Sequence, residues 1–187
     1  MVFAFSTSSP IASVAIFSAM GDVLFSASRT SNMKASEACL SLVSESGYDV
    51  QDGLLFLADI GPGSFTGTRV GVTIAKTLAF AAGAKCGGAT AFDLISPTET
   101  VVLPSKKGEY FVRALGTDPV RTTDLPSGPY LGFGVGIDPQ TYPLAERFLE
   151  LLESISKVSP EELLPAYLIE PSISVQKKGF GLSPVTK

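Results

Sequence analysis

The residues that could do chemistry gather around one glycine-rich stretch, Gly61 to Gly67 (GPGSFTG), with Asp59 before it and Arg69 after it. A loop of this kind, between an apolar run and a helical pattern, can present backbone N–H groups to an anion such as a phosphate. It can equally allow two elements to approach closely, because glycine has no side chain. The anion interpretation would use Gly61, Gly63, Ser64, Thr66, Gly67 and Arg69.

Each polar residue of this stretch also has a simpler interpretation. Ser64 and Thr66 are typical helix caps. Asp59 and Arg69 are typical of solvated charges at the end of a strand and the start of a helix. The stretch alone therefore leaves both an anion site and a purely structural turn open.

The chain contains no histidine, which excludes Ser-His-Asp and Cys-His catalysis within it. Its two cysteines, Cys39 and Cys86, lie in apolar surroundings and form no CxxC pair, so a conventional zinc site is disfavoured. We expect reduced, buried thiols. The sequence predicts no catalytic residue and no metal site.

Composition describes a globular chain of 187 residues with a net charge of −4. Its longest basic clusters are the pairs Lys106-Lys107 and Lys177-Lys178, which argues against direct, strong nucleic-acid binding. The start of the chain, Met1 to Ser6, has the pattern of a β-strand and lacks the basic region of a signal peptide. We expect a cytoplasmic protein without a membrane span.

The periodicity predicts two lobes followed by a flexible tail. Residues 1–95 read as a ribonuclease H-like lobe, and residues 96–169 as a reduced second lobe with a tail at 170–187. The predicted strands are 2–7, 11–18, 23–28, 54–58, 85–90, 101–103, 110–115 and 130–137. The predicted helices are 33–46, 68–82, 91–95 and 141–156, and a short one opening at Ser159 and ending near Pro165.

The helix predicted at 68–82 carries two stripes. One is an ordinary aliphatic core face. The other is a ridge of small residues spaced four apart, namely Gly67, Gly71, Ala75 and Ala79. The ridge can pack against the chain's own sheet, or it can be a docking face for a helix of another subunit. In the second case, Gly71→Leu or Ala75→Phe should block association and leave the fold intact.

The stretch GPGSFTG followed by Thr68 to Gly71 (TRVG) closely resembles the GPGSFTGLRIG signature of the bacterial TsaB (YeaZ) family. The opening residues Phe5 to Ala15, the turn Lys106 to Tyr110 and the segment Leu164 to Leu168 also resemble that family. Two positions depart from its pattern. Ser6 stands where many members have aspartate, and Ala35 stands where they often have histidine.

The resemblance implies an α/β fold of the ribonuclease H-like, actin-like ATPase (ASKHA) class. It also implies a non-catalytic subunit of the complex that forms N6-threonylcarbamoyladenosine at position 37 of tRNA. The implied partners are a TsaD-type catalytic paralogue of the glycoprotease (M22) group, a second copy of the chain and, as a further candidate, a TsaE-type ATPase. Contact with tRNA would be indirect, and peptidase activity is not expected.

The implied interface comprises Met33, Ala35, Ser36, Glu37, Leu40, Gly67, Gly71, Ala75, Lys76 and Ala79. No cofactor would be required, although ATP or ADP could bind weakly at a subunit interface. The alternative is a small actin-like ATPase acting alone. Ser6 in place of aspartate favours the subunit, because that carboxylate would help to hold a hydrated Mg²⁺ beside the phosphates.

Overall fold

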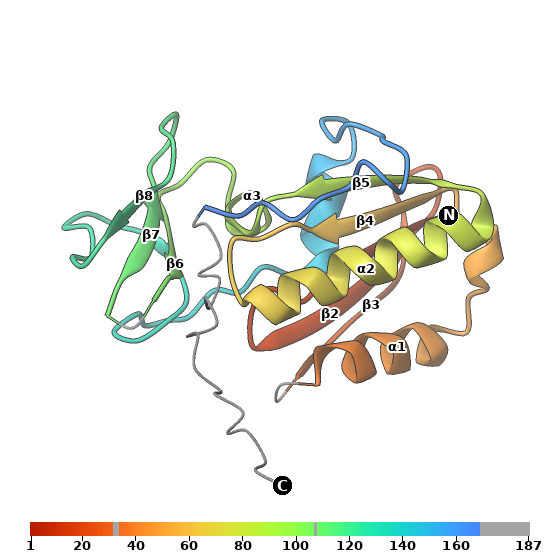
Figure 1. The fold of residues 1–187 in the computed structure, drawn as a ribbon, viewed down its shortest axis with the longest axis horizontal. Coiled ribbons are helices and arrows are strands. Elements are labelled where there is room, and N and C mark those ends of the chain that lie inside the picture. Colours follow the sequence, from red (N-terminus) through yellow and green to blue (C-terminus); the bar gives the residue numbers. More distant parts are fainter. Residues whose placement is uncertain (32–33, 107, 169–187) are drawn as a thin grey trace, which may run out of the picture.

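The computed structural model describes residues 1–31, 34–106 and 108–168 (Figure 1). Two mixed sheets make an α/β architecture. The larger sheet has five strands in the order β3-β2-β1-β4-β5. Its strands are β1 (Val2–Ser6), β2 (Ile11–Phe17), β3 (Val23–Thr30), β4 (Leu55–Asp59) and β5 (Lys85–Ala89). The first three are antiparallel, and β4 and β5 run parallel to β1, so the predicted meander followed by alternating helices and strands is confirmed.

Alternate residues of β1 supply two separate cores, as a strand buried on both faces requires. Phe3 and Phe5 belong to one core, and Ala4 belongs to the other. Across the β1–β4 pair, Phe3 lies opposite Phe56 and the two rings stack with their centroids 5.2 Å apart. The large aromatic side chains therefore fill the face on which the helices pack.

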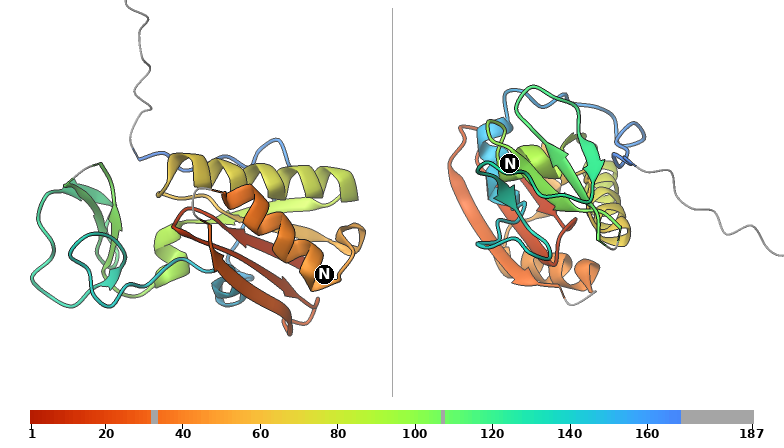
Figure 2. Two further views of the ribbon diagram at one scale, coloured as in Figure 1. Left: turned by 90° about the horizontal axis from the view of Figure 1, so that it is seen from below. Right: turned by 90° about the vertical axis from the view of Figure 1, so that its left-hand side faces the viewer.

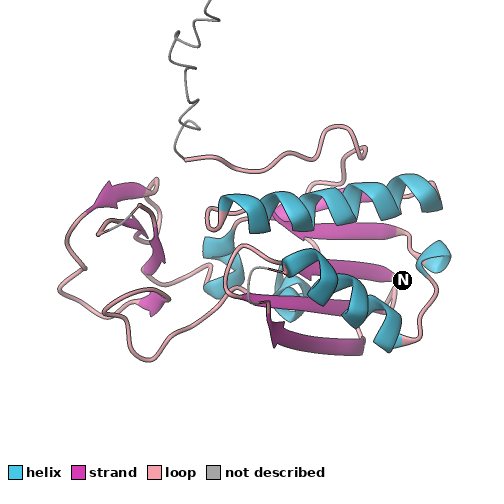
Figure 3. Cartoon of the chain, turned by 60° about the horizontal axis from the view of Figure 1, so that its bottom comes forward, coloured by secondary structure: helices cyan, strands magenta, loops and turns pink. Residues whose placement is uncertain are grey.

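Helices α1 (Ala35–Ser46) and α2 (Phe65–Ala82) cover this face of the sheet (Figures 2 and 3). Gly47 and Gly83 end them in the left-handed conformation, as the sequence predicts. α2 begins three residues earlier than predicted, because Ser64 caps it by accepting a hydrogen bond from the Gly67 N–H. The opposite face packs on the 3-10 helix η2 (Ala145–Leu151), and a short 3-10 turn, η1 (Val50–Asp52), leads into β4.

The second sheet has four short strands in the order β8-β7-β6-β9. They are β6 (Val101–Pro104), β7 (Tyr110–Arg113), β8 (Val120–Thr122) and β9 (Leu131–Gly132). Helix α3 (Ala91–Ile95), capped by Thr90 as predicted, contributes to the core of this sheet. The predicted hairpin is confirmed by the β6–β7 pair, whereas β8 was not predicted.

Three predictions beyond residue 130 are wrong in detail. The strand predicted at 130–137 stops at Gly132, because Gly132, Gly134 and Gly136 adopt positive φ and turn the chain. The helix predicted at 141–156 shortens to η2. Between Ser159 and Leu168, where the description of the chain ends, only turns form, although Glu162 accepts a hydrogen bond from the Ser159 N–H at 2.8 Å.

The predicted tail at 170–187 lies outside the described residues. Within residues 1–31, 34–106 and 108–168, no helix is both long enough and apolar enough to cross a bilayer. The division into domains and the cytoplasmic location stay predictions. We call the five-stranded sheet with the helices packed on it the first lobe, and the four-stranded sheet the second lobe.

Candidate functional site

The glycine-rich stretch is the turn between β4 and α2, and it packs directly on the turn between β1 and β2. The Ser64 N–H donates to the Ser8 carbonyl oxygen at 2.7 Å. A Cβ at Gly63 would clash with the Ser8 carbonyl, and one at Gly67 would clash with the Thr7 carbonyl. These glycines are therefore required by the close approach of two backbones, the second role that glycine allows there.

The polar groups of this turn bond largely to the turn itself. The Gly61 N–H donates to Asp59 Oδ1 at 2.8 Å, and the Gly67 N–H donates to Ser64 Oγ at 3.2 Å. Thr66 and Arg69 are exposed, and the Arg69 guanidinium lies 5.0 Å from the centre of the Phe65 ring. The capping interpretation of Ser64 is confirmed. Anion binding by the six candidate loop residues stays a prediction.

Asp59 ends β4 as a fully buried carboxyl group, so its interpretation as a solvated charge is wrong. Its Oδ2 accepts hydrogen bonds from Ser8 Oγ and, at 2.7 Å, from Ser6 Oγ. Burial raises the pKa of Asp59, and the hydrogen bonds from Ser8, Ser6 and Gly61 oppose that rise. The Ser6 hydroxyl also lies 2.9 Å from the Pro143 carbonyl. Both Asp59 oxygens are thus occupied by the protein.

A metal ion would need a different arrangement of ligands. Among the residues that the structure describes, no group of three or more Cys, Asp or Glu side chains could hold one. Cys39 and Cys86 are buried free thiols, and desolvation raises the pKa of Cys39 to about 12 and that of Cys86 to about 11. Neither cysteine is therefore a ready thiolate nucleophile or metal ligand near neutral pH.

The candidate interface residues of α1 are partly at the surface. Ser36, Glu37 and Leu40 are exposed, whereas Ala35 is half-buried. Glu37 forms an ion pair with Lys34 at 3.1 Å. Met33 lies outside the described residues. A groove of about 320 Å³ separates the start of α1 from α2, and it is lined by Ser36, Phe65, Thr66, Arg69, Val70, Thr73 and Ile74.

The small-residue ridge of α2 faces inward, which corrects its interpretation as a docking face. Gly67 and Gly71 are buried, and Ala75 and Ala79 have no exposed surface. A Cβ at Gly71 would lie 2.6 Å from Thr7 Oγ1. Gly71→Leu or Ala75→Phe would therefore overpack the chain's own core and would not report on association alone. Lys76 is half-buried, and its Nζ lies 3.4 Å from the Glu161 carbonyl oxygen.

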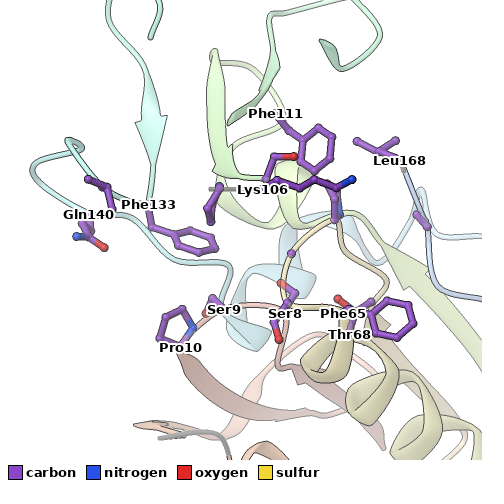
Figure 4. A pocket seen from close by; sticks show the side chains of 18 of the residues that line it. Ser8, Ser9, Pro10, Phe65, Thr68, Lys106, Phe111, Phe133, Gln140 and Leu168 are labelled. Atoms are coloured by element: carbon purple, nitrogen blue, oxygen red, sulfur yellow. The ribbon is translucent and has the colours of Figure 1, made fainter. Parts of the chain in front are cut away.

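A cavity of about 1110 Å³ lies between the two lobes (Figure 4). The first lobe contributes the β1–β2 turn with Ser8 and the start of α2 with Phe65 and Thr68. The second lobe contributes Phe111 and Phe133, and Tyr167 and Leu168 complete the wall. The sequence did not predict this cavity, because its walls come from distant segments; the glycine-interleaved run around Phe133 was its one local signal.

Comparisons with known proteins bear on this fold and turn. Residues 25–92, which include the glycine-rich turn and all of α2, match the family described as TsaD: tRNA N6-adenosine threonylcarbamoyltransferase. No curated protein matches the chain.

Among solved structures, one from Pseudomonas aeruginosa, described as an uncharacterized protein with similarity to peptidase YEAZ, superimposes with a TM-score of 0.75 at 18% identity. That match covers 90% of this chain and 99% of the other. YeaZ from Pseudomonas aeruginosa superimposes with a TM-score of 0.72 at 18% identity, covering 89% and 99%. Residues 25–92 thus resemble the TsaD family model, and the chain has the fold of the YeaZ structures.

Proposed function

We propose that this protein is a non-catalytic subunit of the complex that forms N6-threonylcarbamoyladenosine at position 37 of tRNA. It binds a TsaD-type catalytic paralogue and holds that partner in its active conformation. The family match over residues 25–92 and the fold shared with YeaZ support the proposal. A coupling of about 1–3 kcal/mol between binding and the partner's active state would suffice.

The observation that best supports a non-catalytic role is that both carboxyl oxygens of the buried Asp59 are already hydrogen-bonded within the protein. An actin-like ATPase holds a hydrated Mg²⁺ through carboxylates near the phosphates, and Mg²⁺ demands free oxygen ligands. Here Ser6 stands at the position where many family members have an aspartate. Both oxygens of the buried Asp59 accept hydrogen bonds, from Ser6, Ser8 and Gly61. Hydrolysis of ATP by this chain alone is therefore the less supported alternative.

The exposed parts of α1 and α2 are the proposed binding face. The face consists of Ser36 and Leu40 on α1, Thr73 and Phe80 on α2, and the groove between the helices. Leu40 and Phe80 are 51% and 75% exposed, and exposed large apolar side chains are typical of a protein contact surface. This face replaces the buried ridge as the proposed contact surface of α2.

The test measures binding of the full chain to its TsaD-type paralogue by calorimetry, with variants Leu40→Asp and Thr73→Asp. Because a charge at an interface centre stays unpaired and desolvated, we expect each to weaken binding at least about tenfold. Leu115→Asp, at a leucine of the second lobe that is 67% exposed, is the matched control and should bind normally. Melting temperatures should stay within a few degrees of the parent.

Formation of the modified nucleoside, in a reaction reconstituted with the partner proteins, should follow the affinity across these variants. Equal affinity for all three variants would contradict the proposed face. Mg²⁺-dependent ATP hydrolysis by the purified chain alone would overturn the non-catalytic assignment and favour the ATPase.

A further inference from the structure

Two residues that line the cavity between the lobes carry hydroxyl groups that the described part of the chain leaves without a hydrogen-bond partner. They are Thr68 Oγ1, on the first turns of α2, and Ser105 Oγ, on the second lobe. Thr68 is only 3% exposed. A buried hydroxyl without a partner is costly, so such groups indicate a missing hydrogen-bond partner. Both residues line one cavity, Thr68 from the first lobe and Ser105 from the second.

The wall of the cavity is mainly apolar and contains flat rings. Phe111 and Phe133 are 7% and 4% exposed, and Phe65 packs on Tyr167 with ring centroids 5.5 Å apart. Figure 4 shows the Phe111 and Phe133 rings on the second-lobe side and Phe65 beside Thr68 on the first-lobe side. An apolar, concave wall with a few converging polar groups is typical of a small-molecule site. Its rings favour a planar, aromatic ligand.

The charged groups that line the cavity indicate which charge a ligand would carry. Lys106 is the one charged side chain among the described residues that line the cavity. Ser64 and Phe65, at the N-terminal end of the 18-residue helix α2, also line it, and that end of a helix favours negative charge. Asp59 is fully buried beneath the adjacent turn, and its oxygens are occupied. The cavity therefore suits a single anionic group better than a metal-bound polyphosphate.

We propose that the cavity between the lobes binds a small aromatic monoanion. Its ring lies against Phe111 and Phe133, its anionic group lies near Lys106, and its polar atoms bond to Thr68 and Ser105. This site is separate from the proposed binding face on α1 and α2. A negative result for ligand binding in the cavity would therefore not contradict the proposed function.

The primary probe is 1-anilinonaphthalene-8-sulfonate, an aromatic monoanion whose fluorescence rises in apolar surroundings. The full chain should bind one equivalent saturably. Phe133→Leu keeps an apolar side chain but removes the ring, and it should weaken binding about two- to tenfold. Thr68→Val keeps the shape but removes the unpartnered hydroxyl, and it should weaken binding without lowering the melting temperature. Thr73→Val, at an exposed threonine of the same helix, is its matched control.

The charge is tested by two competitors that differ only in it, indole-3-acetate and the neutral indole-3-acetamide. The parent chain should bind the acetate more tightly, by about two- to fivefold, as expected for one exposed ion pair. Lys106→Gln should remove that preference, whereas Lys157→Gln, at an exposed lysine outside the cavity, should keep it.

Three results would overturn the proposal. They are non-saturable dye binding, equal affinity in the parent and Phe133→Leu, and displacement of the dye by Mg·ATP at lower concentration than by indole-3-acetate. The last would assign the cavity to a nucleotide instead.

Discussion

The two sheets differ in what covers them. The first-lobe sheet lies between α1 and α2 on one face and η2 on the other, so its central strands are buried on both sides. The second-lobe sheet has shorter strands, and its core combines Val101, Leu103, Phe111 and Phe133 with Phe92 and Ile95 of α3. α3 follows directly from β5 of the first lobe. The core of the second sheet therefore includes α3, whereas the cores of the first sheet take no residue from β6–β9 and are completed by Ala145, Phe148 and Leu163 from beyond β9.

The largest effect should come from a cavity in the central sheet. Leu57 and Leu103 are both fully buried, one in each lobe. Leu57→Ala should lower the free energy of unfolding by about 2–5 kcal/mol and reduce amide protection in both lobes. Leu103→Ala, the matched change, should reduce protection mainly in β6 and β7. Hydrogen exchange with urea unfolding measures both, and equal loss of first-lobe protection in the two variants would contradict this expectation.

The junction between the lobes should give the next effect. The Arg113 guanidinium pairs with Asp93, donates to the Ser96 carbonyl and lies 5.3 Å from the centre of the Phe92 ring. Arg113→Met keeps the apolar stem and loses these bonds, which should cost about 1.5–3 kcal/mol. Arg147→Met, at an exposed ion pair with Glu150, should cost less than about 1 kcal/mol. Similar melting temperatures for the two variants would mean that Arg113 does not stabilise the junction.

Removing a helix cap should have a smaller effect. Ser64→Ala removes the side chain that accepts from the Gly67 N–H, and Thr90→Ala removes the one that accepts from the Asp93 N–H. Each should cost about 1 kcal/mol in urea unfolding. Only Thr90→Ala should increase exchange selectively in the second lobe, since its helix contributes to that core. The reverse pattern would show that α3 belongs energetically to the first lobe alone.

The smallest effect concerns pH. Burial raises the pKa of Asp59 above its ordinary value, so the folded chain holds this proton more tightly than the unfolded chain. The stability contributed by Asp59 is fully present below its unfolded pKa and is lost as the pH rises through the folded pKa. In Asp59→Asn, Ser6 can donate to Pro143 and accept from the new amide. The free energy of unfolding of the parent, minus that of this variant, should fall as the pH rises above the ordinary pKa of an aspartate. A stability difference between the parent and the variant that grows with pH would mean that folding lowers the pKa of Asp59, and it would contradict this prediction.

Local signals predicted much of the first lobe. The uninterrupted apolar run at 54–58, the capping Ser64 and the closing Gly83 each act within a few residues, so sequence reveals them. The second lobe was predicted less well. Gly132, Gly134 and Gly136 read as members of a strand, but their positive φ is set by packing against distant segments such as Pro104.

The candidate site divides in the same way. The close-approach alternative for the glycine turn was available from sequence. The sequence did not reveal that the backbone groups approaching these glycines are the carbonyls of Thr7 and Ser8. The cavity was missed because Thr68 and Phe133, far apart in the chain, meet only once the lobes are in place.

The sequence by itself determined that the chain lacks histidine chemistry, that three antiparallel strands precede alternating helices and strands, and that a glycine turn begins a long helix of small residues. These are properties of composition and local periodicity. Only the tertiary structure decided that the ridge Gly67, Gly71, Ala75 and Ala79 faces inward, and that Asp59 is buried. A four-residue period defines a face of a helix but not what that face meets, because burial depends on contacts between residues distant in the chain.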